Sequence, residues 1–246
     1  MKLETVETMF NLIESKFFTN GSNLYDTGLE WNPKAYNKNK GFVGHWLEKQ
    51  LDIPHGPEHL DLIDGDLKTW DVKANKKGEL TGKEDFRIMK NETDSDDIVK
   101  KMLWEKMGRM LVVPVLRPNF SEGLIEKTVH ILKPKILDLQ THPLSKDLET
   151  LLLEDFEIII KKRKESNISQ GDTSALIYKT QASKGSRNAK GNLDGNTSRS
   201  FYFSSKFMSW YFGNPTQWKG VRKANLKKKL EEFEKKRPMS SFNSFA

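Results

Sequence analysis

The chain has 246 residues and no cysteine, which excludes disulfides, thiolate metal sites and a cysteine nucleophile. Charged residues make up 30% and hydrophobic residues 36%, and 14 Phe and 6 Trp are enough to build a core, so a disordered chain is excluded. No apolar run approaches the roughly 18 residues of a membrane span, and the acidic start MKLETVETMF is unlike a signal peptide. We therefore expect a cytoplasmic protein without a membrane partner.

In chain order, hydrophobic periodicity predicts helices over 4–18 and 41–51, separated by an Asn- and Gly-rich loop over 20–41. Two strands follow over 60–63 and 66–73, joined by a hairpin turn at Asp64-Gly65. The rest of the chain is expected to form helices over 96–107, 144–163 and 216–237 and strands over 109–116, 125–132 and 175–180. Pro114 is expected to place its strand near a sheet edge. The mixture predicts an α/β fold with a mixed central β-sheet flanked by helices, in one domain or two closely packed lobes.

The net charge of +7 is concentrated near the end of the chain. Residues 216–246 contain nine Lys/Arg and three Glu, whereas residues 1–215 are nearly balanced. A basic balance of this kind makes nucleic acid or another anionic surface a plausible partner. We interpret residues 214–246 as a Lys-rich helical extension, whose lysines either form a solvated face or contact phosphates.

Three residues near the second predicted strand point to chemistry. Asp66 and Lys68 are two residues apart, so both side chains leave the same face of the strand, and Asp61 can reach that place from the preceding strand. Carboxylate oxygens suit a hard cation such as Mg²⁺. Such a cation polarises a phosphoryl oxygen and activates water, while the lysine positions or deprotonates that water. Phosphodiester hydrolysis requires these parts, although the same pattern also occurs as an exposed ion pair beside a simple turn.

Glu48 is a further candidate carboxylate. It lies on the predicted helix over 41–51, on one face with Gly41 and Gly44. Glycines there remove side-chain bulk, so that the active-site strand or a nucleic-acid backbone can approach closely. We expect Glu48 to act as a metal ligand or as a group that supports the ligands.

The segment 40–75 resembles the MutH family of endonucleases, which belongs to the wider PD-(D/E)XK nuclease group. The family includes a mismatch-repair nicking enzyme and GATC-cutting type II restriction enzymes. Its pattern Lys-Gly-(aromatic)-Val-Gly, then Leu-Glu, Asp and Glu-Leu-Lys-Thr is similar to Lys40-Gly41-Phe42-Val43-Gly44, Leu47-Glu48, Asp61 and Asp66-Leu67-Lys68-Thr69. Asp66 replaces the usual Glu. Asp61 precedes it by only five residues, which leaves Glu58 and Asp64 as alternatives to Asp61.

Two later stretches strengthen the resemblance. The passage from Glu105-Lys106 to Val115 is similar to a helix-to-strand passage in which the family has an active-centre lysine, matched by Lys106. The segment 199–203 is similar to the family's Arg-Gly-Phe-Tyr-Leu, whose tyrosine approaches DNA, and Lys179 falls where the family has a DNA-contacting basic residue. Ser204 and Ser205 stand where the mismatch-repair enzyme has lysines.

The resemblance implies a restriction-endonuclease-like domain over residues 1–213, with a catalytic part over about 1–135, a recognition part over about 136–213, and lobes that form a DNA cleft. It implies Asp61, Asp66 and Glu48 as ligands of Mg²⁺, for which Mn²⁺ can substitute, and Lys68 and Lys106 as further catalytic residues. The DNA-binding residues expected on this basis are Lys40, Lys179, Lys184, Arg199, Tyr202 and Lys206.

The function that follows is a type II restriction enzyme that cuts double-stranded DNA at GATC or a similar short palindrome, leaving 5′-phosphate and 3′-hydroxyl ends. A cognate DNA methyltransferase is the expected partner in the same system, and a homodimer is not required. Two alternatives stay open. One is a mismatch-repair enzyme that nicks hemimethylated GATC, and the other is a catalytically inactive DNA-binding regulator.

Overall fold

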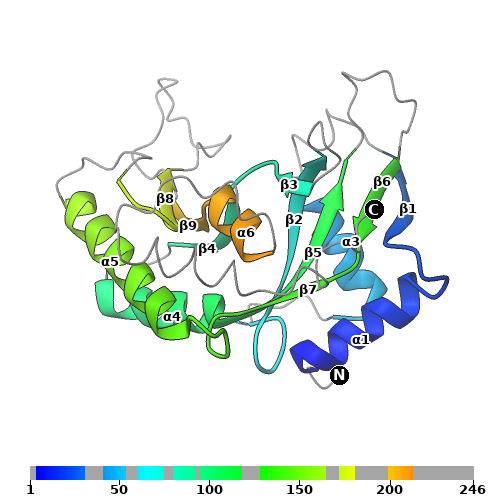
Figure 1. The fold of residues 1–246 in the computed structure, drawn as a ribbon, viewed down its shortest axis with the longest axis horizontal. Coiled ribbons are helices and arrows are strands. Elements are labelled where there is room, and N and C mark those ends of the chain that lie inside the picture. The colour runs from blue at the N-terminus through cyan, green and yellow to red at the C-terminus, as the bar shows by residue number, and fades with distance from the viewer. Residues whose placement is uncertain are drawn as a thin grey trace, which may run out of the picture. The chain divides into compact units, whose positions relative to one another are not determined.

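The computed structural model describes residues 4–30, 41–53, 60–74, 80–91, 95–117, 128–164, 172–180 and 199–212. These residues form two compact units, and both contain helices and strands, which confirms the predicted α/β class (Figure 1). The first unit takes its described residues from Met1–Glu84 and Gly108–Asp138, and the second from Asp85–Met107 and Leu139–Arg237. None of the described helices is both long enough and apolar enough to cross a membrane.

The first unit is built on a mixed six-stranded sheet. Its strands are β1 (Leu24–Glu30), β2 (Asp66–Ala74), β3 (Leu80–Gly82), β5 (Arg109–Leu116), β6 (Thr128–Leu132) and β7 (Lys135–Asp138). The order is β1-β6-β5-β2-β3, and β7 also pairs with β5. β2 and β5 run parallel, from the Asp66–Met110 pair to the Val72–Leu116 pair, while the other pairings are antiparallel. The predicted mixed sheet is therefore confirmed.

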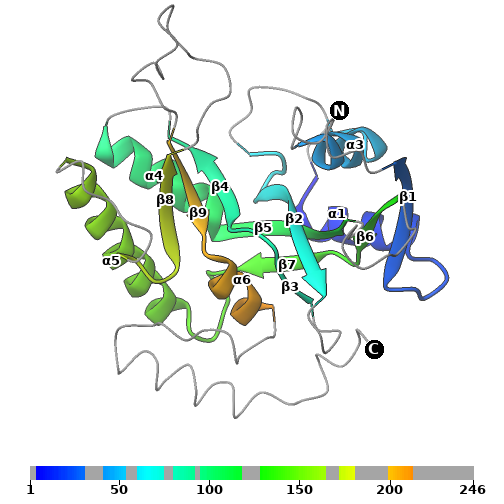
Figure 2. The same ribbon diagram turned by 90° about the horizontal axis from the view of Figure 1, so that it is seen from above.

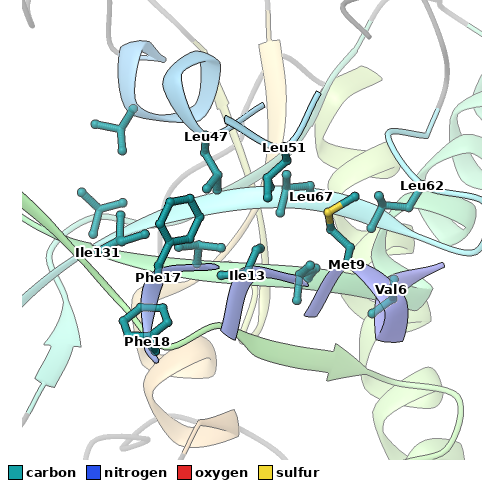
Figure 3. Packing of buried hydrophobic residues seen from close by; sticks show 14 of the residues in the cluster. Val6, Met9, Ile13, Phe17, Phe18, Leu47, Leu51, Leu62, Leu67 and Ile131 are labelled. Atoms are coloured by element: carbon teal, nitrogen blue, oxygen red, sulfur yellow. The ribbon is translucent and has the colours of Figure 1, made fainter. Parts of the chain in front are cut away.

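Two helices, α1 (Val6–Phe17) and α3 (Phe42–Gln50), cover one face of this sheet. The Thr5 side chain caps α1 by accepting a hydrogen bond from the Thr8 N–H at 3.2 Å. The apolar stripe of α1 meets α3 and the sheet in one buried cluster, which includes Met9, Ile13, Phe17, Leu47, Leu51, Leu67 and Ile131 (Figure 3). The helices predicted over 4–18 and 41–51 are thus confirmed, and their apolar periodicity is the reason that both pack on this face.

The parallel pairing of β2 with β5 separates apolar from functional side chains. Leu67 and its partner Leu111 face the helices and belong to the cluster. Asp66 lies beside Met110, and Lys68 beside Val112, on the opposite face. Both Met110 and Val112 are fully buried. The candidate catalytic residues therefore project from a strand whose other face is anchored in the core.

Three details of this sheet differ from the sequence-based expectation. β1 lies inside the segment predicted to be a loop, since it is a half-exposed strand with an irregular register and Gly28 at φ 68°. Residues 60–63 form a turn instead of a strand, and only an isolated bridge joins Leu62 to Gly65. β5 lies inside the sheet. Pro114 is tolerated there because it falls between the residues paired with β7 and those paired with β6.

The second unit contains a three-stranded antiparallel sheet of β4 (Phe86–Lys90), β9 (Arg199–Phe203) and β8 (Leu176–Thr180), in that order. Its helices are α4 (Asp96–Gly108), α5 (Ser145–Lys164) and α6 (Ser205–Tyr211). α5 packs against β8 (Figure 2). The buried Asp155 carboxylate of α5 accepts hydrogen bonds from the backbone N–H groups of Ser174, Ala175 and Leu176, which fixes the start of β8. The helices predicted over 96–107 and 144–163 are confirmed.

Replacement of Ile13 by alanine should lower the free energy of unfolding by about 2–5 kcal/mol, because Ile13 is fully buried in the cluster between α1 and the sheet. Leu12 is the matched control, since it is the next residue of the same helix and is 40% exposed. Leu12→Ala should cost about 0.5 kcal/mol or less. Chemical denaturation of both variants measures the difference, and equal losses would contradict the described packing of α1.

Candidate active site and nucleic-acid face

The three residues singled out at the start of β2 lie together in the structure. The Lys68 Nζ is 2.8 Å from the Asp66 Oδ2 and 3.5 Å from the Asp61 Oδ2. The Asp66 side chain is fully buried, whereas those of Asp61 and Lys68 are each about three-tenths exposed. One ammonium group therefore bridges two carboxylates, and the Asp61 and Lys68 side chains keep this cluster partly exposed to solvent.

The charges of this cluster are strongly coupled. Burial, together with the hydrogen bond to Asp66, raises the pKa of Asp61 to about 7, although the Lys68 charge acts in the opposite direction. Burial lowers the pKa of Lys68, but the charges of Asp66 and Asp61 outweigh it and raise that pKa above its usual value. Lys68 therefore stays positively charged at neutral pH and acts as a hydrogen-bond donor. Asp61 therefore carries a proton through much of the acidic range, because burial and the neighbouring Asp66 both disfavour its negative charge.

The turn that carries Asp61 is held from three sides. The Asp61 Oδ2 accepts a hydrogen bond from the Leu67 N–H at 3.2 Å, which ties the turn to the first residues of β2. The Asp64 Oδ1 accepts one from the Val6 N–H at 2.8 Å, at the first residue of α1. The Asp64 Oδ2 is paired with Arg109, the first residue of β5. Both Asp64 oxygens thus bind structural partners that hold the turn. Asp61 is therefore the better candidate for the first catalytic carboxylate.

Arg109 and Gly65 complete this arrangement. Besides Asp64, the Arg109 guanidinium pairs with Glu7 of α1 and with Asp138 of β7 at 3.3 Å. A Cβ at Gly65 would lie 2.6 Å from the Arg109 carbonyl oxygen and 2.7 Å from the Val6 Cγ2, which no real side chain tolerates. Glycine is therefore required where the turn passes between α1 and β5.

Glu48 does not join the carboxylate pair to form a larger metal group. Within the described ranges, no three His, Cys, Asp or Glu side chains are placed to hold a metal ion. Glu48 is half-buried on α3 and shares a helix face with Gly44. A Cβ at Gly44 would lie 3.7 Å from the Thr69 Oγ1, which is ordinary contact, so the packing of α3 on β2 does not require glycine there. The predicted role of Glu48 stays a prediction.

The other residue expected at the catalytic centre, Lys106, lies in the last turn of α4 and belongs to the second unit. It is half-buried, and its catalytic role stays a prediction. Lys40, Lys184 and the alternative carboxylate Glu58 lie outside the described residues, as does the extension over 214–246.

The candidate DNA-binding residues of the second unit fall on both faces of its three-stranded sheet. The Lys179 Nζ lies 5.6 Å from the centre of the Tyr202 ring and is paired with Asp85. Arg199 instead places its guanidinium 5.8 Å from the Tyr178 ring. Because Tyr178 pairs with Phe201, and Lys179 with Ser200, the rings of Tyr178 and Tyr202 are on opposite faces. Lys206 is exposed on α6.

Sequence reasoning did not identify the residues that hold these sites in place. Arg109 and Gly65 shape the turn that carries Asp61, and Asp85 holds Lys179 while it also accepts a hydrogen bond from the Ser205 N–H at 2.8 Å. The only sequence signal was the Asp-Gly dipeptide, which indicated a tight turn. The partners of Arg109 and Asp85 come from distant parts of the chain.

Comparison with protein-family models gives no match for this chain, and a search of curated proteins gives no match either.

Replacement of Gly65 by alanine should lower the free energy of unfolding by about 1–3 kcal/mol, because the new Cβ overlaps the β5 backbone. Gly44→Ala is the matched control. It inserts a methyl group at an ordinary contact distance inside a helix, where alanine is favoured over glycine by about 1 kcal/mol. Denaturation curves should therefore show opposite shifts, and a Gly65→Ala protein as stable as the native one would contradict the described turn.

The raised pKa of Asp61 predicts a pH-dependent stability in the presence of EDTA. The folded chain binds a proton at Asp61 that the unfolded chain has lost above about pH 4. The stabilisation from this group is therefore complete below about pH 4 and is lost as the pH rises through about 7. Asp61→Asn removes the group, so the melting temperature of the variant minus that of the native protein should increase between pH 5 and pH 8. A constant difference would contradict the raised pKa.

Proposed function

We propose that this chain is a Mg²⁺-dependent, site-specific endonuclease of double-stranded DNA with a PD-(D/E)XK core. The observation that carries the proposal is the Lys68 ammonium held between the Asp61 and Asp66 carboxylates at the start of β2. The resemblance to the MutH family supports the same residues. The proposal extends to a type II restriction enzyme that cuts at GATC or a similar short palindrome and works beside a cognate DNA methyltransferase.

The carboxylate pair fits Mg²⁺ by its chemistry. Two carboxylates lie beside one ammonium, so a divalent cation could add the positive charge that a second ionised carboxylate needs. Mg²⁺ typically binds through one or two carboxylates and completes its coordination with water and substrate phosphate. Asp61 and Asp66 would hold the ion, and Glu48 would support them. When bound, the ion would stabilise negative charge on the phosphoryl oxygens and favour ionisation of water.

The proposed roles of the protein's own side chains in the hydrolysis fall to Lys68 and Lys106. Lys68, kept charged by Asp66, is suited to donate a hydrogen bond to the attacking water or to a phosphate oxygen. In the hydrolysis, the water oxygen bonds to phosphorus, the bond from phosphorus to the 3′ oxygen breaks, and that oxygen leaves as a hydroxyl after gaining a proton. The products are a 5′-phosphate and a 3′-hydroxyl. Lys106 is proposed to support the charged transition state.

DNA as the substrate is favoured by the charge and by the second unit. The chain has a net charge of +7, and phosphate contacts from lysine and arginine provide most of the non-specific affinity for DNA. Lys179 and Tyr202 lie together on one sheet face, which joins a cation to an aromatic ring. Lys40, Lys184, Arg199 and Lys206 are proposed as further DNA contacts.

The test is incubation of supercoiled plasmid with the protein in Mg²⁺ and in EDTA. Linear molecules with ends at one short palindrome would support a restriction enzyme, whereas open circles would indicate the nicking enzyme of mismatch repair. A gel shift without cleavage would indicate a catalytically inactive regulator and would contradict the proposed reaction. Mn²⁺ should restore cleavage after EDTA treatment.

Asp61→Asn and Lys68→Gln should each lower the cleavage rate by about 100-fold or more, because each removes one part of the charged centre. Binding to DNA should persist, since affinity comes chiefly from phosphate contacts elsewhere. Asp26→Asn is the matched control for carboxylate loss in the same unit, because Asp26 is exposed on β1. Native cleavage rates in either site variant would contradict the assignment.

A further inference from the structure

The outer strand β4 presents two cations on the same face of the second unit's sheet because it contains a β-bulge. Arg87 pairs with Tyr202, and Lys90 pairs with Ser200, with a register shift between Arg87 and Met89. Residues three apart on a regular strand would point to opposite faces. The extra residue of the bulge brings Arg87 and Lys90 onto the same face of the sheet. Both are exposed, whereas Ile88 and Met89 between them are both buried. Bulges of this kind re-aim side chains and are frequent next to active sites.

The same face carries Tyr202 and Lys179. Directly paired residues on adjacent antiparallel strands share a face, so Arg87 lies beside Tyr202. Lys179 of β8 approaches the Tyr202 ring from the other neighbouring strand. We call Arg87, Tyr202, Lys179 and Lys90 the basic face. The opposite face of the sheet is occupied by the core, where Phe201 stacks on Phe156 of α5 with ring centres 6.1 Å apart.

The two cations next to Tyr202, Lys179 and Arg87, differ in their ion-pair partners. Lys179 is paired with Asp85, which is itself anchored by the Ser205 N–H. Arg87 is exposed, and it forms no ion pair among the described residues. A surface that binds only the phosphate backbone needs no more than positive charge. A face that combines donors, a carboxylate acceptor and an aromatic ring has the composition needed to read base edges, which present both acceptors and donors in the major groove.

We propose that Arg87 is a specificity-determining residue that donates two hydrogen bonds to a base edge of double-stranded DNA, with Tyr202 packed beside it. The bidentate arginine–guanine pair is the commonest specific contact in protein–DNA recognition, and paired antiparallel strands can enter the major groove. Asp85 is the positioning residue that keeps Lys179 next to Tyr202. This inference rests on the proposed function, because it names the part of the chain that would choose the cleavage site.

The competing explanation is that Arg87 and Lys90 protect an edge strand. β4 is at the edge of its sheet, and charged side chains on such strands prevent pairing with other chains. That role needs charge but no particular geometry, so lysine would replace Arg87 without effect. A phosphate contact would also tolerate lysine, whereas a bidentate base contact would not.

The experiment selects preferred sites from a library of duplexes with randomised sequence, by binding in Ca²⁺ and by cleavage in Mg²⁺. Arg87→Ala should reduce discrimination at one base pair of the preferred site by roughly tenfold or more. Arg87→Lys should not restore it. Lys161→Ala is the matched control, because Lys161 is exposed on α5, which packs against the sheet's other face, and it should leave the preferred site unchanged.

Other outcomes would overturn the inference in distinguishable ways. A uniform loss of binding to all sequences, restored by Arg87→Lys, would identify a phosphate contact. If Arg87→Ala does not change the site preference, protection of the edge strand β4 remains as the explanation of its charge. If the native protein selects no DNA sequence in either assay, the proposed function itself fails and the inference fails with it. If it selects a site by binding but does not cut, the binding assay still decides the role of Arg87.

Discussion

The fully buried carboxylate of Asp66 is the constraint on which the candidate active site depends. An ionised group without solvent must be compensated, and the ammonium of Lys68 at 2.8 Å provides that charge. The parallel pairing of β2 with β5 places both residues on one face, because they are two positions apart. Asp61 lies beside the same pair, and its burial together with its hydrogen bond to Asp66 raises the pKa of this carboxyl to about 7.

The position of Asp61 is set by the core of the first unit. Its turn is bound to α1 through Asp64 and Val6, and to β5 through Arg109. α1 is held in turn by the buried cluster that it forms with the sheet (Figure 3). Hydrophobic packing therefore fixes the separation of the carboxylates, and Gly65 allows the turn to fit between the helix and the strand.

The sequence was sufficient to predict the features that follow from local periodicity. The spacing of Asp66 and Lys68 predicted their common face, and apolar patterns predicted the main helices. The Asp-Gly signal did not distinguish a hairpin from the isolated turn that is present, because the same dipeptide serves both. The Asn- and Gly-rich composition concealed β1, whose side chains alternate between exposed and half-buried without any of them being fully buried. Features that depend on long-range pairing were not predictable, including the partners of Arg109 and the bulge that turns Arg87 onto the basic face.

The most direct measurement is the position of Mn²⁺ in crystals of the protein, located by its anomalous scattering. If Asp61 and Asp66 form a divalent-cation site, a peak should lie within coordination distance, about 2.0–2.3 Å, of oxygens from both carboxylates. The same peak should be absent from crystals of Asp61→Asn. A native crystal in Mn²⁺ with no peak at this pair, or with the ion bound only elsewhere, would contradict the assignment of the start of β2 as a metal-dependent active site.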